Sequence, residues 1–121
     1  MDRLKELFKA KFTVASEEIK TLLKEHGTKV IDQVQIEQVY GGMRGIKSMI
    51  WETSSLDAQE GIRFRGYSIP ELREKLPCID GAKEPLPEGL FWLMMTGEIP
   101  TDDDVRWLSR EWMRRSEVPD H

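Results

Sequence analysis

The apolar residues among the first 27 positions recur every three to four residues, which is the spacing of one helix face. A short amphipathic helix is predicted over residues 3–12, with its apolar positions at Leu4, Leu7, Phe8 and Phe12. The β-branched pair Thr13 and Val14 weakens that helix. We therefore predict a second helix, which begins after Ser16 as its N-cap and ends at Gly27 in the left-handed conformation.

The middle of the chain changes from a helical period to a strand period. Residues 35–40 form a short stretch that predicts a single helical turn, ended by a glycine pair. Strands are predicted over residues 49–51 and over GIRFRG, residues 61–66, where two apolar residues alternate with two arginines. The turn-rich sequence DAQEG lies between these two runs. The pattern therefore predicts one small β-hairpin.

A capping box opens the next predicted helix. In the sequence SIPE, Ser68 can accept a hydrogen bond from the amide of Glu71, and the Glu71 carboxylate can reach back to Ser68. Leu72 and Leu76 are predicted to face the core, and Pro77 ends the helix.

Two further helices are predicted after a loop over residues 77–85. The first begins near Pro87 and stops at Gly97, and its apolar run over 90–95 occupies every side, which is typical of a fully buried helix. The second has Thr101 as its N-cap, three aspartates in its first turn and two arginines at its end. Its buried stripe is predicted at Val105, Leu108 and Trp112. The fold class is therefore mainly α, with one small β-hairpin.

Length and composition are those of one globular domain: 121 residues, of which 39% are hydrophobic and 33% charged. The net charge of −4 gives the chain no overall attraction to nucleic acid or to an anionic membrane. No apolar run approaches the roughly 20 residues that cross a bilayer. The single cysteine, Cys78, excludes an internal disulfide and is predicted to be a small apolar filler.

Few side chains suit acid–base or metal chemistry. His26 is predicted to stabilise the end of a helix, and His121 is the last residue. The acidic run Asp102, Asp103 and Asp104 is explained by a helix N-terminus rather than by a metal ion. The sequence has no Cys/His metal spacing and no glycine-rich phosphate loop of the required form.

A basic stretch is the remaining candidate for ligand binding. It spans residues 41–66 and carries four basic residues: Arg44, Lys47, Arg63 and Arg65. Arg44 stands among three glycines, where backbone can approach a ligand closely, and a guanidinium there can hold a phosphate with two hydrogen bonds. A surface ion pair is the commoner role of an arginine. The residue pattern alone leaves both interpretations open.

Three stretches, in order and at matching spacing, resemble the citrate synthase family of the eukaryotic, mitochondrial type: YGGMRGIK, WETSSLDAQEGIRFRGYSIPEL and EPLPEGLFWLMMTGEIPT. The resemblance runs from about Leu4 to the end of the chain. It implies a mostly α-helical homodimer, in which residues 1–121 correspond to the N-terminal segment of the large helical domain.

The resemblance also implies a reaction. Members of the family condense acetyl-CoA with oxaloacetate to give citrate and CoA, with no permanently bound cofactor. One histidine and one aspartate remove a proton from the acetyl methyl group, while a second histidine and several arginines hold oxaloacetate and polarise its carbonyl. The resemblance places all of these in later segments of a longer enzyme. We therefore assign no catalytic residue and no metal ligand to this chain, and expect its 121 residues alone to be inactive.

One binding residue is carried over from the family. Arg44, in GGMRG, matches a family arginine that approaches the phosphate end of CoA. Arg63 and Arg65, in GIRFRG, match a recurring family motif, and we interpret them as structural, through hairpin pairing and ion pairs. The implied partners are acetyl-CoA, oxaloacetate and a second copy, without nucleic acid or membrane. The implied compartment is the mitochondrial matrix, and the start of the chain lacks the serines expected of a transit peptide.

Two alternatives stay open at this point. One is 2-methylcitrate synthase, which uses propionyl-CoA and shares this region of sequence. The other is a short helical interaction module, in which apolar faces, notably over residues 90–95, promote self-association or docking onto a partner.

Overall fold

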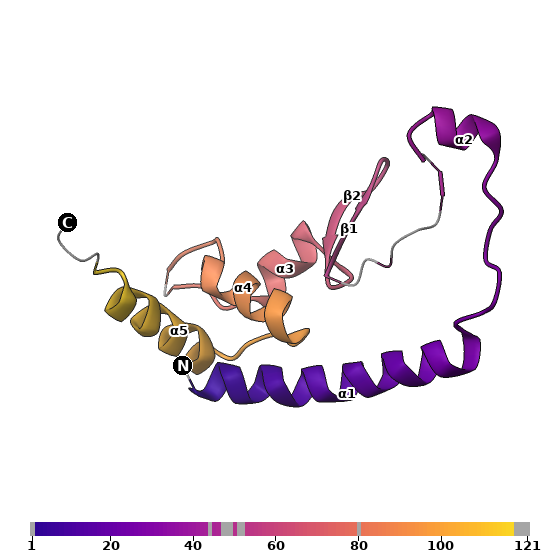
Figure 1. Ribbon diagram of the computed structural model, residues 1–121. Coiled ribbons are helices and arrows are strands. Elements are labelled where there is room, and N and C mark those ends of the chain that lie inside the picture. The colour runs from indigo at the N-terminus through magenta and orange to yellow at the C-terminus, as the bar shows by residue number, and fades with distance from the viewer. Residues whose placement is uncertain (1, 44, 47–49, 51–52, 80, 118–121) are drawn as a thin grey trace. The chain divides into compact units, whose positions relative to one another are not determined.

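The computed structural model describes residues 2–43, 45–46, 50, 53–79 and 81–117, and Figure 1 shows its elements. These residues contain helices α1 to α5 and strands β1 to β3, in the order α1, α2, β1, β2, β3, α3, α4, α5. They group into two compact units. One consists of Lys9–Ile50, and the other of Met1–Phe8 together with Trp51–His121.

Helix α1 is one continuous helix over Asp2–His26. The predicted division into two helices is therefore wrong, and Ser16 lies inside α1 rather than at an N-cap. Inside the helix the hydroxyl of Thr13 donates to the carbonyl of Lys9 at 2.9 Å, one helical turn back, so that its polar group is satisfied within the helix itself. Two β-branched residues cost only a few tenths of a kcal/mol each in a helix whose neighbours favour helix.

The end of α1 also differs from the prediction. Gly27 follows the helix and its amide donates to the carbonyl of Leu23 at 2.9 Å, but its φ is not positive. The left-handed cap predicted at Gly27 is therefore wrong. Helix α2, Ile36–Tyr40, confirms the predicted single turn, and Gly41 caps it.

Strands β1 (Ser54–Asp57), β2 (Gly61–Phe64) and β3 (Tyr67–Ser68) form an antiparallel sheet in sequence order. The predicted strand in GIRFRG is confirmed as β2, and β3 adds a third strand to the expected hairpin. The strand predicted over residues 49–51 is wrong at Ile50, which has no regular structure, and the other two residues lie outside the described part.

The turn after β1 explains where the first strand lies. The Asp57 carboxylate accepts hydrogen bonds from the amides of Gln59 and Glu60, at 2.7 and 2.9 Å. These bonds hold the turn in place and lower the pKa of Asp57, so that the acceptor stays ionised. The turn sets the register in which Leu56 lies opposite Ile62.

Helices α3 (Ile69–Lys75), α4 (Pro87–Thr96) and α5 (Asp102–Arg115) follow the sheet. Both predicted N-caps, Ser68 and Thr101, are confirmed as reciprocal capping boxes. Gly97 ends α4 with a φ of 76°, the left-handed conformation that glycine adopts without a steric cost. In the described residues no helix combines the length and the apolar character that crossing a membrane requires.

In the unit that contains Trp51–His121, the core lies between α3 and α4. Its buried cluster consists of Leu72, Leu76 and Leu93, and it is flanked by partly buried side chains from the sheet, from α4 and from the loop after α4: Phe64, Tyr67, Leu90 and Ile99. Val105 and Leu108 of α5 are also buried, as predicted. Burial of each large apolar side chain contributes about 1.5–3 kcal/mol.

Helix α4 is less enclosed than its composition predicts. Trp92 and Leu93 are buried, but Phe91 and Met95 are 38% and 37% exposed. Trp112 of α5, predicted in the core, is also 38% exposed and meets Phe91 edge to face. The described residues therefore cover one side of α4, and the prediction of a helix buried on every side is wrong for them.

Candidate functional site

Arg44 and Lys47, two of the four basic residues of the stretch 41–66, lie outside the described residues, as does His121. Their described neighbours show the tight turns expected of a glycine-rich stretch. Gly42 and Gly45 both have a φ of 77°. That conformation favours glycine, which explains the residue type at these two positions.

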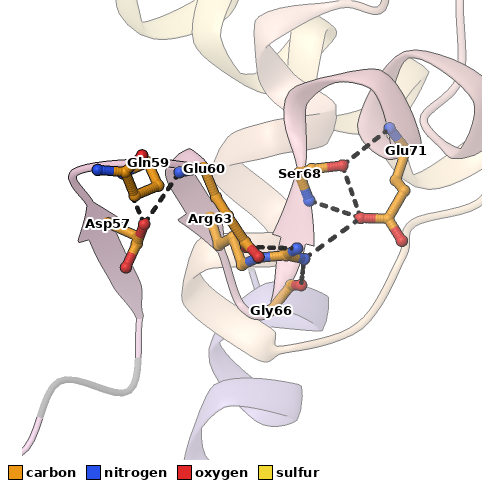
Figure 2. A network of polar contacts seen from close by, with 7 residues as sticks. All are labelled: Asp57, Gln59, Glu60, Arg63, Gly66, Ser68 and Glu71. Carbon is orange, nitrogen blue, oxygen red and sulfur yellow. Dashed lines mark hydrogen bonds and ion pairs between the residues drawn. The ribbon is translucent and has the colours of Figure 1, made fainter.

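Arg63 is the centre of a polar network that joins the sheet to α3, and Figure 2 shows it. The guanidinium donates to Glu60 Oε2 through Nε at 2.9 Å and to the Gly66 carbonyl through Nη1 at 3.0 Å. Glu71 Oε2 lies 3.7 Å from the same Nη1. The prediction that Arg63 has a structural role, through hairpin contacts and ion pairs, is confirmed.

The carboxylate of Glu71 is shared between this network and the cap of α3. Its Oε2 accepts hydrogen bonds from the amide and the hydroxyl of Ser68, both at 2.7 Å, as Figure 2 shows. These bonds lower the pKa of Glu71, whereas the hydrogen bond to Glu60 raises the pKa of Arg63. The stabilisation from Glu71 is therefore present above the ordinary glutamate pKa and is lost as the pH falls through the lowered value.

Arg65 occupies the first position of the two-residue turn between β2 and β3. Its φ is 49°, and that of the next residue, Gly66, is 87°. Positive φ at both positions defines the hairpin turn in which asparagine–glycine is preferred, so an arginine there is strained. The guanidinium compensates through Nε and Nη2, which donate to the Met94 carbonyl of α4 at 3.1 and 2.7 Å.

The backbone of Arg65 makes a further contact, because its amide donates to the carbonyl of Thr53 at 2.8 Å. One residue thus connects the beginning of β1, the turn between β2 and β3, and the last turn of α4. The structural role predicted for Arg65 is confirmed, although its side chain makes hydrogen bonds to a carbonyl in place of the expected ion pair.

The substitution Arg65→Met is expected to lower the free energy of unfolding by about 1.5–3 kcal/mol, because both hydrogen bonds from a charged donor are lost while the strained turn stays. Arg65→Asn is expected to cost less, because asparagine suits this turn. Urea unfolding measures both. The control is Arg73→Met, which removes an exposed ion pair to Glu84 and is expected to change stability by less than about 1 kcal/mol. Equal effects of Arg65→Met and Arg73→Met would contradict the role of Arg65.

The acidic N-terminus of α5 contains the most enclosed carboxylate of the described residues. Asp104 is 6% exposed, and its Oδ2 accepts from the amide and the hydroxyl of Thr101, at 3.0 and 2.7 Å. Nη2 of Arg3 lies 2.7 Å from Oδ1 and forms an ion pair with it. The angles of this contact are not those of a hydrogen bond. Asp104 therefore caps α5 and also contacts the start of α1 through an ion pair.

Two contacts had no signal in the sequence. The first is the ion pair between Arg3 and Asp104, which lie far apart along the chain. The second joins α4 to α5, where the Ser109 hydroxyl donates to Glu88 Oε1 at 2.6 Å. The structure brings together no group of three or more His, Cys, Asp or Glu side chains that could hold a metal, within the part of the chain it describes. Cys78 is half-buried, and its Sγ lies 3.8 Å from the Leu76 carbonyl.

The described residues form a mainly α-helical structure with one small sheet, and ion pairs and hydrogen bonds join these elements. Comparison with known proteins gives its family: residues 42–121 match the sequence model described as "Citrate synthase, C-terminal domain". The "Citrate synthase, mitochondrial" of Neurospora crassa is 60% identical over 116 residues, which are 96% of this chain and 25% of that protein. The chain belongs to the citrate synthase family.

Two other relatives give the same picture. The "Citrate synthase, mitochondrial" of Saccharomyces cerevisiae is 57% identical over 118 residues, 98% of this chain and 25% of that protein. The "2-methylcitrate synthase, mitochondrial" of Yarrowia lipolytica is 57% identical over 120 residues, 99% of this chain and 26% of that protein. The chain spans about a quarter of the length of these relatives. Its place as the N-terminal segment of the large domain stays a prediction.

Proposed function

We propose that the full-length protein condenses acetyl-CoA with oxaloacetate to give citrate and CoA. The observation that carries the proposal is the 60% identity to a protein named as a citrate synthase, over 96% of this chain. The described residues supply a frame of capped helices and no acid–base pair, so we assign the proton transfers to the rest of the full-length protein. The role of residues 1–121 is then to support the fold and to contribute one CoA contact.

The test is oxaloacetate-dependent release of the CoA thiol from acetyl-CoA. The full-length protein is expected to release CoA, and residues 1–121 alone are expected to release none, because the reaction needs several converging groups. A full-length protein without this activity would overturn the proposal. Activity of residues 1–121 alone would overturn the assignment of catalysis to other segments.

A second candidate function is favoured by the relative from Yarrowia lipolytica, which is named as a 2-methylcitrate synthase and is 57% identical to this chain. The two functions differ by one methylene of the acyl group, which a pocket distinguishes by about 1–3 kcal/mol. The ratio of kcat/KM for acetyl-CoA to kcat/KM for propionyl-CoA, measured on the full-length protein, separates them. A ratio well above one supports citrate synthase.

Arg44→Ala is expected to raise the KM for acetyl-CoA of the full-length protein about tenfold or more, because a guanidinium–phosphate contact contributes about 1.5–3 kcal/mol. The KM for oxaloacetate is expected to stay unchanged, since the proposed contact is with the CoA phosphate. Arg73→Ala, at an exposed ion pair, is the matched control. An unchanged KM for acetyl-CoA in Arg44→Ala would remove Arg44 from the site.

The assembly and the compartment are part of the same proposal. We infer a homodimer, as the family resemblance implies, and a location in the mitochondrial matrix. Three relatives whose printed names include the word mitochondrial support this location. Light scattering of the purified full-length protein tests the dimer, and fractionation of mitochondria tests the matrix location.

A further inference from the structure

Helix α2 leads directly into the glycine-rich stretch that contains Arg44, and the helix ends in a Schellman motif. The amide of Met43 donates to the Gln38 carbonyl at 2.7 Å, and the amide of Gly42 donates to the Val39 carbonyl at 3.4 Å. Gly42 has the left-handed conformation that this motif requires, with a φ of 77°. The path of the backbone out of α2 is therefore fixed as far as Met43, the residue before Arg44.

Met43 has an unfavourable backbone conformation. Its φ of 62° is rare for a residue with a side chain. The Met43 side chain is 52% exposed, so the packing of that side chain does not account for the conformation. Strained backbone persists only where other contacts hold it, and here the contact is the hydrogen bond from the Met43 amide to Gln38. The conformation of Met43 therefore depends on an intact α2.

Gln38 connects the two ends of α2. Its side-chain Oε1 accepts a hydrogen bond from the Gln35 amide at 2.8 Å, and its backbone carbonyl accepts the bond from Met43. Because Oε1 takes part in the first bond, Nε2 is the group near Gly45, where a Cβ would lie 4.0 Å from it. Gln38 is half-buried, whereas every other residue from 17 to 43 is exposed. Gln38 thus bonds to the residue before Arg44 and lies near the residue after it.

We propose that Gln38 is a positioning residue for Arg44. By holding α2 and the turn after it, Gln38 sets the direction of the backbone at Arg44 and prepares that residue to bind the phosphate of CoA. The inference rests on the proposed function, in which Arg44 makes this contact. A helix of five residues is marginal by itself, so the side-chain bond at its start decides how firmly the turn is held. A binding group that is held in advance loses less conformational entropy when its ligand binds.

Steady-state kinetics of the full-length protein test this role. Gln38→Ala is expected to raise the KM for acetyl-CoA about threefold or more and to leave kcat and the KM for oxaloacetate unchanged, because only the CoA contact loses its support. Gln33→Ala is the matched control, since Gln33 is exposed and precedes α2. Equal values of the KM for acetyl-CoA in the two variants would overturn the proposal.

A double-mutant cycle shows whether Gln38 acts through Arg44. In an Arg44→Ala background, Gln38→Ala is expected to raise the KM for acetyl-CoA no further, because the group that it positions is already absent. A purely structural role of Gln38 predicts the same factor in both backgrounds. That additive result would overturn the proposal.

Gly42→Ala tests the other end of the turn. A methyl group at Gly42 would meet no atom within 4 Å, so its cost comes from the positive φ alone. We expect this variant also to raise the KM for acetyl-CoA about threefold or more.

Gly81→Ala is the matched control for this second variant. Gly81 lies in the loop between α3 and α4, has a φ of 83° and likewise has no atom within 4 Å of an added methyl group. The KM for acetyl-CoA is expected to stay unchanged in Gly81→Ala, and equal effects of the two alanines would overturn the proposal. An unchanged KM in Arg44→Ala would instead overturn the CoA contact of the proposed function, so the two failures are distinguishable.

Discussion

Leu93→Ala is expected to lower the free energy of unfolding by about 3–5 kcal/mol. Leu93 is 0% exposed and belongs to the cluster that holds α3 against α4. The substitution removes three buried carbon atoms and leaves a cavity whose lining comes from Leu72 and Leu76, and helix backbones limit how far that cavity can collapse. Since small domains have only about 5–15 kcal/mol in total, much of the native state is lost.

Urea unfolding followed by circular dichroism measures this change. Met95→Ala is the matched control on the same helix, because Met95 is 37% exposed and loses little buried surface. Leu93→Met keeps the volume and is expected to cost less than about 1.5 kcal/mol. If Leu93→Ala and Met95→Ala destabilise equally, the cluster is not the core of this unit.

Asp104→Ala is expected to lower the free energy of unfolding by about 2–3 kcal/mol, which is less than the effect of Leu93→Ala. It removes the side-chain partner of the Thr101 amide at the N-cap of α5 and leaves that partly buried donor without its protein acceptor. It also removes the ion pair to Arg3. The exposed end of that pair recovers water, so the cap accounts for most of the loss.

Three variants separate these contributions in thermal unfolding. Asp103→Ala lies in the same helical turn on an exposed position and is expected to change stability by less than about 1 kcal/mol. Arg3→Ala removes only the ion pair and is expected to cost less than Asp104→Ala. If Asp103→Ala equals Asp104→Ala, the effect belongs to the helix dipole and not to the buried cap.

Helix ends with their own chemical signature were predictable from the sequence. Ser68, Thr101 and Gly97 each act through neighbours within one turn, so that a local pattern was sufficient. The break predicted at Thr13 was wrong because a weak helix former was treated as a helix breaker. Strand β1 was missed because SSLD has a single apolar residue, and its pairing with β2 is fixed by the Asp57 turn.

The long-range contacts were not predictable from any local pattern. GIRFRG indicated structural arginines, and that interpretation is confirmed for Arg63 and Arg65. The sequence could not show that Arg65 reaches Met94, because the two are separated by 29 positions and by an entire helix. The burial of α4 was overestimated for a related reason. An apolar composition indicates that a helix can be buried, but it does not show which other segment covers each of its sides.

The three strands and α3 follow one another without interruption between residues 54 and 75, and each pairs with an element next to it in sequence. Every loop that must close is short, so the entropic cost of closure is small and formation is fast, on the order of microseconds for a hairpin. Such a segment can form as soon as it leaves the ribosome, before distant parts of the polypeptide have been synthesised. The sheet and α3 would then act as a nucleus onto which later helices condense during translation.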